Sequence, residues 1–347
     1  MRFNPERVLT IKEKAIFLCD RGIIRVQNVY SNKTIKELSE SVDLDEFVYG
    51  KDNLDPQAAS QTQIIFSTWG MPEFNRDEIK RLFPNLKIIF YAAGSVQHFA
   101  KPFIDSGIRV VSAWAANAIP VAEFTFSQII LANKGFLPAQ RIIKEQGYEA
   151  ARIFTDLNFK GTFDCTVGII GAGMIGRKVI EMLRACDIRT KILVFDPFLP
   201  EESANSLGVK LCSLETLFEE SNVISNHLAN NPRTRGMLNY NLFQRMKPSA
   251  AFINTGRGAQ VIEADLIRAL TEYPNRSAIL DVTYPEPPEK DHEFYKMPNV
   301  FISCHISGSL GDETYRMGEY ILKELKLYLA NEKPQYEVTR QMLETMA

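Results

Sequence analysis

The chain has 347 residues, of which 45% are hydrophobic and 24% are charged, as in an ordinary globular protein. This length exceeds what one hydrophobic core usually serves, so we expect two domains. A formal net charge of -2, with dispersed Lys and Arg, provides no basic surface for nucleic acid or an anionic membrane.

The cysteines and the apolar runs limit the cellular setting. The five cysteines are odd in number and include no C-x-x-C pair, which argues against a disulfide framework or a zinc site and favours a reducing compartment. Residues 1–14 lack the apolar run of a signal peptide, and no apolar run approaches the ~18 residues of a membrane span. We therefore expect a cytoplasmic protein with no metal, no membrane partner and no nucleic-acid partner.

The first part of the chain alternates short apolar runs with helical segments, which is typical of βαβ units and a parallel sheet. Strands are predicted at residues 15–20, 63–68, 87–92 and 109–113, with a weaker one near 47–49, and helices at 33–41 and 76–83. The longest helical candidate, residues 117–134, is apolar on most faces. We expect it to be buried against both domains or against a partner subunit.

The second part of the chain has the same alternation. Six strands are predicted, at residues 167–171, 191–196, 222–227, 250–255, 278–282 and 300–304. Their apolar runs lack strict alternation, which indicates strands covered on both faces. A periodic helix over residues 312–329 has no strand of its own, so we expect it to return to the first domain.

The glycine-rich segment 171–176, GAGMIG, has the G-x-G-x-x-G spacing of a dinucleotide-binding turn. It follows a predicted strand and precedes a helical segment. The next predicted strand ends in Asp196, where the acidic residue of that fingerprint belongs. The alternative is a glycine turn in a ligand-free βα unit, with Asp196 as a strand-end cap.

The physical reason for this spacing is that glycines let a pyrophosphate approach backbone N–H groups at a helix N-terminus. Asp196 can accept hydrogen bonds from the adenosine ribose, and the same carboxylate repels a 2′-phosphate. Residues 197–199 supply no cation to offset that repulsion. NAD is therefore favoured over NADP.

Several polar residues stand directly after the later strands. Arg257 follows the fourth strand, Glu286 lies shortly beyond the fifth, and His305 comes after the sixth. Since the carboxyl ends of parallel strands lie along one edge, we expect these three side chains to gather at one crevice. Each also has a plain structural interpretation: a solvent-facing loop cation, a turn residue and a capped core histidine.

These blocks resemble the D-isomer-specific 2-hydroxyacid dehydrogenases. The matching segments, between about residues 86 and 312, are VGIIGAGMIG, MKPSAAFINTGRGAQVIEADLIRAL, DVTYPEPP, NVFISCHISGS and the long helix VAEFTFSQIILA. Residues 1–85 match only in general pattern. The resemblance implies an α/β fold of two doubly wound parallel-sheet domains and a homodimer. A Rossmann cofactor domain (117–308) would be inserted into a flavodoxin-like substrate domain (1–116 with 309–347).

The resemblance also implies an NAD-dependent enzyme that moves a hydride between nicotinamide and a small 2-hydroxy or 2-oxo acid. Arg257 would hold the substrate, His305 would exchange the proton, and Glu286 would orient His305 and stabilise its charged form. The backbone of Gly94 and Ser95 would bind the substrate carboxylate. The implied cofactor residues are Gly171, Gly173, Met174, Ile175, Gly176, Asp196, His227, Thr255, Gly256 and Asp281, the last near the nicotinamide.

The sequence departs from the family pattern in places that affect the substrate. Residues 92–98 (AAGSVQH) replace the usual Gly-x-Asn-x-Asp turn, and Cys304 replaces a common proline before the histidine. We interpret Cys304 as a small buried strand residue rather than a reactive thiol. Trp69 and Trp114 could line the substrate cleft, although a place in the core is slightly favoured.

Two other functions remain open at this point. An NAD-sensing, corepressor-like protein could use the same scaffold with little catalysis, although the intact Arg257, Glu286 and His305 argue against it. A formate dehydrogenase-like enzyme would need an amide side chain partnering the histidine, and none stands near Cys304.

Overall fold

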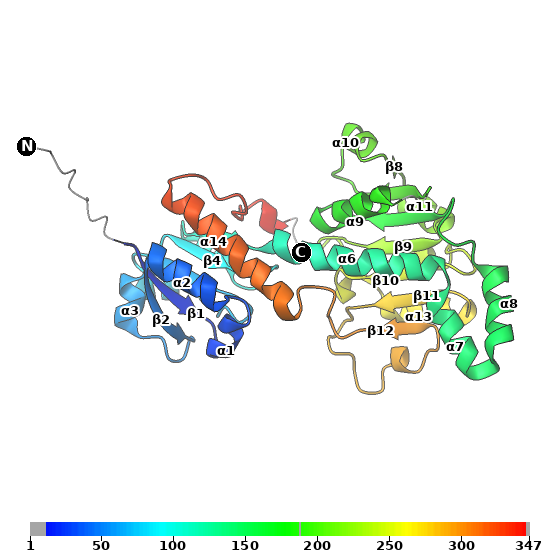
Figure 1. The fold of residues 1–347 in the computed structure, drawn as a ribbon, viewed down its shortest axis with the longest axis horizontal. Coiled ribbons are helices and arrows are strands. Elements are labelled where there is room, and N and C mark those ends of the chain that lie inside the picture. Colours follow the sequence, from blue (N-terminus) through cyan, green and yellow to red (C-terminus); the bar gives the residue numbers. More distant parts are fainter. Residues whose placement is uncertain (1–11, 187–188, 345–347) are drawn as a thin grey trace, which may run out of the picture. The chain divides into compact units, whose positions relative to one another are not determined.

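The computed structural model describes residues 12–186 and 189–344, which form two compact units (Figure 1). One contains the chain up to Asn117 together with Gly311–Glu344, and the other contains Ala118–Leu310. In each unit the paired strands are all parallel, and the central strands are buried along their whole length. Burial on both faces is expected when helices cover both sides of a sheet. The predicted fold class is confirmed.

The first unit has a five-stranded sheet in the order β2-β1-β3-β4-β5, the flavodoxin-like order. Its strands are β1 (Lys14–Leu18), β2 (Asp43–Tyr49), β3 (Ile64–Ser67), β4 (Ile88–Tyr91) and β5 (Arg109–Ser112). Its helices are α1 (Gly22–Gln27), α2 (Asn32–Ser41), α3 (Pro56–Gln61), α4 (Arg76–Leu82), α5 (Ala100–Asp105) and α14 (Tyr315–Leu329), with short 3-10 turns η3 (Gly311–Thr314) and η4 (Met342–Glu344).

Local sequence explains where these elements begin. The Ser31 side chain accepts the Thr34 N–H at the start of α2, and Asn75 and Glu78 form a reciprocal capping box at the start of α4. The weakly predicted strand proved longer than expected, because β2 begins at Asp43. It is an edge strand with mostly exposed side chains, so its acidic residues hide the apolar pattern of a buried strand.

The second unit has a seven-stranded sheet in the order β12-β11-β10-β9-β6-β7-β8, the Rossmann order with one added strand. Its strands are β6 (Thr166–Ile170), β7 (Lys191–Phe195), β8 (Lys210–Leu211), β9 (Val223–Asn226), β10 (Ala251–Asn254), β11 (Ser277–Leu280) and β12 (Val300–Ile302). The six predicted strands are all present. The strand β8 was not predicted, because two residues are too few to show a periodic pattern of apolar side chains.

Most of the helices of the second unit fill the connections between its strands. They are α7 (Phe136–Gln146), α8 (Tyr148–Asn158), α9 (Met174–Ala185), α10 (Glu201–Ser206), α11 (Leu214–Glu220), α12 (Tyr240–Phe243) and α13 (Glu263–Glu272), with 3-10 turns η1 (Gly258–Gln260) and η2 (Glu293–Tyr295). The pair α7 and α8 precedes β6 and was not predicted.

The long helix α6 (Trp114–Asn133) starts in the first unit and continues into the second. Ala116 belongs to the core of the first unit, whereas Ala122 and Ile129 belong to a core of the second. By length and composition it is the one helix among the described residues that could cross a membrane, and half of its most apolar window is buried. The expectation that no apolar run approaches that length was therefore wrong. The helix is apolar largely because it contributes to two cores.

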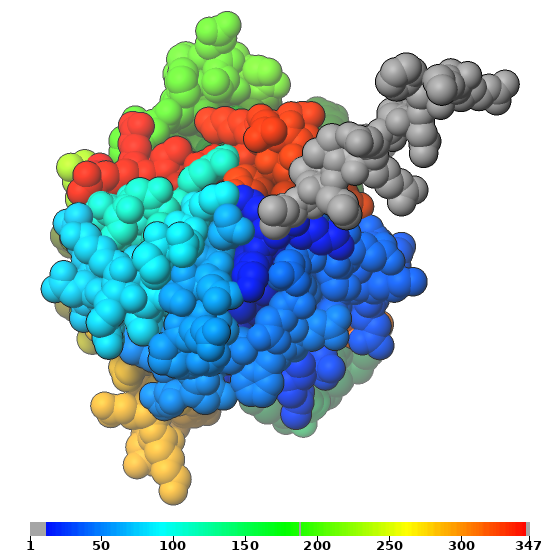
Figure 2. All heavy atoms as spheres, turned by 90° about the vertical axis from the view of Figure 1, so that its left-hand side faces the viewer, coloured from blue at the N-terminus to red at the C-terminus, as the bar shows by residue number. Residues whose placement is uncertain are grey.

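The C-terminal segment returns to the first unit, as predicted. Met317, Ile321 and Leu325 of α14 lie in the core that includes β1, β3 and β4. Beyond α14 the chain adds an antiparallel bridge between Glu337 and Val111 on the open edge of β5. Figure 2 shows this orange-to-red segment lying against the blue and cyan residues of the same unit.

Candidate active site

The glycine loop between β6 and α9 is shaped by close backbone approaches. Gly171 has φ +90°, and a Cβ there would lie 2.7 Å from the His227 carbonyl oxygen. A Cβ on Gly176 would lie 2.1 Å from the Gly171 carbonyl oxygen. A Cβ on Gly173 would meet nothing within 4 Å among the residues described. The first and third glycines are thus required by the fold, and the second leaves an open surface for a ligand.

Helix α9 begins at this open surface. Its N-cap residue is Gly173, which has no side chain to accept the first N–H groups of the helix. Those N–H groups and the helix dipole suit an anion such as a dinucleotide pyrophosphate. Met174 is 43% exposed, and Ile175 is half-buried against a core of the unit. Both residues can therefore offer backbone N–H groups at this end of the helix.

Asp196 follows β7 and is hydrogen-bonded to the glycine loop. Its Oδ2 accepts from the Ala172 N–H at 2.7 Å, and its Oδ1 accepts from the Phe198 N–H at 2.8 Å. Asp196 is therefore a strand-end cap. A carboxylate has about four acceptor positions, so this role leaves room for ribose hydroxyls.

His227 follows β9, and its backbone touches the glycine loop. Its Nε2 lies 2.9 Å from Ser225 Oγ, while its Nδ1 is buried without a hydrogen-bond partner in the described part of the chain. Burial lowers the pKa of His227 to about 3, so the ring is neutral. An unpartnered buried nitrogen here fits a site that a polar ligand or water completes.

His305 and Glu286 form a close pair in the segments that follow β12 and β11. His305 Nδ1 lies 2.6 Å from Glu286 Oε1, and both side chains are almost half exposed. The His305 backbone is left-handed, with φ +57°, and its N–H donates to the Asp281 carbonyl at 3.0 Å. Because Glu286 engages Nδ1, Nε2 is the ring nitrogen of His305 that is available for proton exchange.

Arg257 lies in the loop that follows β10. Its Nη1 donates to the Gly256 carbonyl at 2.8 Å. Burial lowers the pKa of Arg257, while attraction to Glu286 raises it, so Glu286 interacts with both Arg257 and His305. An arginine stays protonated at neutral pH even so. The structure therefore brings the three predicted catalytic side chains together.

Asp281 shapes the segment that carries His305. It is 2% exposed and accepts hydrogen bonds from Ser303 Oγ (2.6 Å), the Ile306 N–H (2.8 Å) and the Ser307 N–H (2.9 Å). Burial raises the pKa of Asp281, but these hydrogen bonds together outweigh it and hold the pKa below its usual range. The carboxylate is thus ionised and already engaged on the loop around His305.

Two buried amides that sequence reasoning missed hold the backbone of Arg257, and a third buried amide links these two. Gln260 Oε1 accepts the Arg257 N–H at 3.2 Å, and Asn254 Nδ2 donates to the Arg257 carbonyl at 3.2 Å. Asn226 Nδ2 donates to Gln260 Oε1 at 2.6 Å and to Asn254 Oδ1 at 3.0 Å. The available signal was an asparagine at the end of each of two apolar strands, because a buried amide there must find partners.

The remaining cofactor candidates lie beside this network. Thr255 Oγ1 lies 3.1 Å from Thr125 Oγ1, which joins the loop to α6, and the Gly256 N–H donates to Asn254 Oδ1 at 3.1 Å. Both candidates therefore lie on the loop that carries Arg257.

The predicted substrate residues Gly94 and Ser95 lie in the first unit, in the loop after β4. They are half-buried, and the Gly94 carbonyl accepts from Ser112 Oγ at 2.7 Å. Arg257 belongs to the second unit, so the two predicted substrate residues and Arg257 lie in different units.

Three further side chains were interpreted from sequence. Cys304 was expected to be buried and is exposed, because β12 ends at Ile302 and the cysteine lies in the following turn. Trp69 is half-buried against the core of the first unit, and Trp114 packs edge-on against Tyr336 at 5.6 Å. The preference for a core position was therefore only partly right for the tryptophans, which are incompletely buried.

Comparison with known proteins adds to this geometry. Residues 126–307, more than half of the chain, match the family model for the D-isomer specific 2-hydroxyacid dehydrogenase, NAD binding domain. The chain belongs to this dehydrogenase family. The family's NAD-binding segment includes the glycine loop, Asp196 and the three catalytic candidates.

Individual members of the family show how far the likeness extends. D-3-phosphoglycerate dehydrogenase from Archaeoglobus fulgidus is 31% identical over 249 residues, which cover 72% of this chain and 46% of that protein. The chain spans about half the length of the phosphoglycerate dehydrogenases that it matches.

Solved structures extend the likeness in fold to almost the whole chain. Apo D-mandelate dehydrogenase from Rhodotorula graminis has a TM-score of 0.79 at 17% identity, covering 95% of this chain and 98% of that one. A phosphoglycerate oxidoreductase from Rhizobium etli has a TM-score of 0.75 at 22% identity, covering 95% and 99%. The likeness in fold therefore includes both units of the described chain.

Proposed function

We propose that this protein is an NAD-dependent D-2-hydroxyacid dehydrogenase acting between a small 2-hydroxy acid and its 2-oxo acid. The observation that carries the proposal is the 2.6 Å contact between His305 and Glu286, with the Arg257 guanidinium attracted to the same carboxylate. Family membership supports it, and nothing in the comparisons favours an NAD-sensing protein without catalysis.

The residues around the glycine loop fit a bound NAD. Gly171, Gly173 and Gly176 would bring the pyrophosphate to the start of α9, where Met174 and Ile175 offer N–H groups. Asp196 would accept the ribose hydroxyls, and His227 and Asp281 would line the rest of the site. Thr255 and Gly256 would lie beside it. The bound nicotinamide supplies or takes up the hydride.

The protein's own groups hold the substrate and move the proton. Arg257 would hold the substrate carboxylate and the reacting carbonyl in a fixed orientation, because a planar guanidinium donates two parallel hydrogen bonds. In reduction, protonated His305 would donate from Nε2 to the ketone oxygen, and in oxidation neutral Nε2 would take the proton back. Glu286 would orient the ring through Nδ1 and stabilise its charged form.

The two domains would bind the substrate and the cofactor separately, as the family resemblance implies. We assign residues 1–116 and 309–347 to the substrate domain and residues 117–308 to the cofactor domain; residues 1–11 and 345–347 lie outside the described parts. In the substrate domain, the N–H groups of Gly94 and Ser95 would bind the substrate carboxylate.

The assembly and the compartment are proposals as well. Exposed apolar side chains gather on α7 and α8, among them Tyr148 (67%), Ile153 (60%) and Leu157 (80%). Apolar surface of this kind on a soluble enzyme marks an interface, which supports a homodimer. The free cysteines and the ordinary surface charge support a cytoplasmic enzyme.

The test is a panel screen that follows NADH consumption with glyoxylate, hydroxypyruvate, pyruvate, phenylpyruvate and 3-phosphohydroxypyruvate. The expected result is saturable turnover with at least one acid, abolished in His305→Ala while NADH binding is retained. NADH binding with no turnover on any acid, in either direction, would instead favour the cofactor-sensing function.

A further inference from the structure

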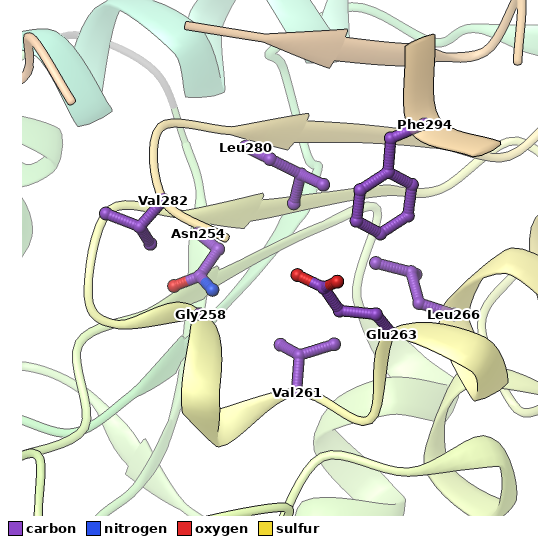
Figure 3. A pocket seen from close by; sticks show the side chains of 8 residues that line it. All are labelled: Asn254, Gly258, Val261, Glu263, Leu266, Leu280, Val282 and Phe294. Carbon is purple, nitrogen blue, oxygen red and sulfur yellow. The ribbon is translucent and has the colours of Figure 1, made fainter. Parts of the chain in front are cut away.

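Glu263, the first residue of α13, directs its carboxylate into a small pocket of the second unit (Figure 3). Val261, Leu266 and Phe294 line this pocket around it. The Glu263 side chain is only 13% exposed, and burial raises its pKa. A carboxylate in such surroundings needs hydrogen-bond partners to offset the cost of its desolvation.

Both partners of Glu263 come from the segment that carries Glu286. Its Oε1 accepts the Tyr284 N–H at 2.8 Å, two residues before Glu286. Its Oε2 lies 3.2 Å from His292 Nε2, six residues after Glu286, and the His292 side chain is 18% exposed. Glu263 therefore holds the segment on both sides of Glu286.

A second contact packs the same segment against the turn after Arg257. The backbone of Gly258 approaches Thr283 so closely that a Cβ on Gly258 would lie 2.0 Å from the Thr283 carbonyl carbon. The segment is thus supported on one side by η1 and on the other by Glu263. Glu286 itself is exposed enough that its own side chain has little packing to fix it.

We propose that Glu263 is a positioning residue for the proton transfer, acting through Glu286 on His305. This inference rests on the proposed function, in which Glu286 stabilises the protonated imidazole. The described charged groups that bear on the arrangement are Glu286, Arg257 and Asp281 around His305, His292 beside Glu263, and Arg235, which donates to the Tyr284 hydroxyl at 2.8 Å. When the anchor at Tyr284 loosens, the Glu286 carboxylate leaves its 2.6 Å contact for part of the time, and the imidazolium loses stabilisation.

The consequence is a change in the pH profile as well as in the rate. Reduction of the 2-oxo acid needs protonated His305, so its kcat/KM falls as the pH rises. In Glu263→Ala the falling limb should move to lower pH, kcat should drop by about tenfold, and NADH affinity should stay within about twofold.

Two conservative variants separate position from charge. Glu263→Asp keeps the charge but shortens the reach to Tyr284, so positioning predicts a limb that moves in the same direction as in the alanine variant. Glu263→Gln keeps the length and an acceptor for the Tyr284 N–H but presents an amide N–H to His292 Nε2, so positioning through Tyr284 predicts a limb that moves less than in the alanine variant. An effect of charge alone would give the opposite pattern, a shifted glutamine variant and an unshifted aspartate variant, and would overturn the inference.

A matched control lies two residues further along the same helix. Asp265 Oδ2 accepts the Tyr240 N–H at 3.0 Å, which anchors α12 and touches no proposed catalytic group. Asp265→Ala should lower the melting temperature without moving the limb. If Glu263→Ala behaves in the same way, Glu263 is only structural and the inference is wrong.

The decisive experiment measures the pH profile of Glu263→Asp alone and combined with Glu286→Gln. The aspartate variant is used because Glu263→Ala could fail to fold. If Glu263 acts through Glu286, Glu263→Asp should move the limb in the wild-type protein and add nothing in the Glu286→Gln background. Equal shifts in the two backgrounds would overturn the inference alone. An unmoved limb in Glu286→Gln itself would overturn the proposed role of Glu286, and the inference with it.

Discussion

At the scale of single residues, Arg257 is positioned through its backbone. Asn254 and Gln260 hold its carbonyl and its N–H, so the guanidinium extends from a fixed point. Its side chain donates to Gly256 alone among the hydrogen bonds of the described residues, which leaves most of its donors for a substrate. This arrangement fits the role that we propose for Arg257, which is to hold an anionic substrate.

Replacing Arg257 should affect binding and turnover together. In Arg257→Lys the fork is lost while a positive charge remains, and we expect kcat/KM to fall by about 10- to 100-fold, since hydrogen bonds to charged groups contribute about 1.5–3 kcal/mol. Arg245→Lys, which changes a surface ion pair with Glu219, is the control and should leave the kinetics unchanged. Steady-state kinetics of reduction decide the matter. Near-normal values for Arg257→Lys would contradict the carboxylate clamp.

Asp196 holds the glycine loop, and the cofactor role that we propose for it can be separated from this contact by substitution. Asp196→Arg removes the repulsion toward a 2′-phosphate and should shift the preference between NADPH and NADH by about tenfold or more toward NADPH. Because Asp196 also holds the Ala172 N–H, Asp196→Asn is the informative partner, since it keeps an acceptor for the glycine loop without the charge. Cofactor titrations of both variants measure the preference. A wild-type preference for NADPH would refute the assignment of NAD.

At the scale of elements, the predictable parts are those whose pattern comes from burial. The central strands and the glycine turn have strong apolar or glycine signals. β2 was short in the prediction because an edge strand carries acidic residues, and β8 was missed because two residues show no period. Cys304 was wrongly predicted to be buried, because its exposure depends on where β12 ends. The role of Asn226 and Asn254 could not be predicted from either residue alone, because it depends on the hydrogen bond between their side chains.

Helix α14 contains a buried acid that makes stability depend on pH. Glu324 is 2% exposed and accepts the Tyr336 N–H at 2.9 Å, which fastens the C-terminal segment. Burial raises the pKa of Glu324 above its ordinary value of 4.5, so the folded protein binds this proton more tightly than the unfolded chain. The contribution of this group to stability should therefore decrease as the pH rises from about 4.5 through the raised pKa.

Glu324→Gln tests this directly, because glutamine keeps an acceptor for Tyr336 and carries no charge. At pH 7 the variant should melt about 2–4 °C higher, the change expected for about 1 kcal/mol in a domain of this size. Glu46→Gln on the exposed edge strand is the control. Melting curves at pH 5 and pH 7 should show a larger gain at the higher pH. A gain that is absent, or larger at pH 5, would mean that the buried carboxylate is not the cause.

At the scale of the whole molecule, the apolar surface of α7 and α8 predicts a self-association that can be broken. Leu157→Glu and Ile153→Glu place a charge where a partner would bury the side chain, so each should convert a dimer to a monomer in light scattering. Ile24→Glu, at a 71% exposed position on α1, should leave the mass unchanged. A wild-type protein that is monomeric at micromolar concentration would rule out the homodimer.

The return of α14 to the first unit also has a consequence for synthesis. Met317, Ile321, Leu322 and Leu325 complete a core whose other buried members are encoded before residue 117. The residues between, Ala118–Leu310, form the second unit. During translation the inserted unit is complete while its host still lacks a helix, and domains fold as units from the N-terminal side of the chain. The first unit therefore completes its core only after the second unit has been synthesised, and until then the apolar side chains of that core lack part of their packing.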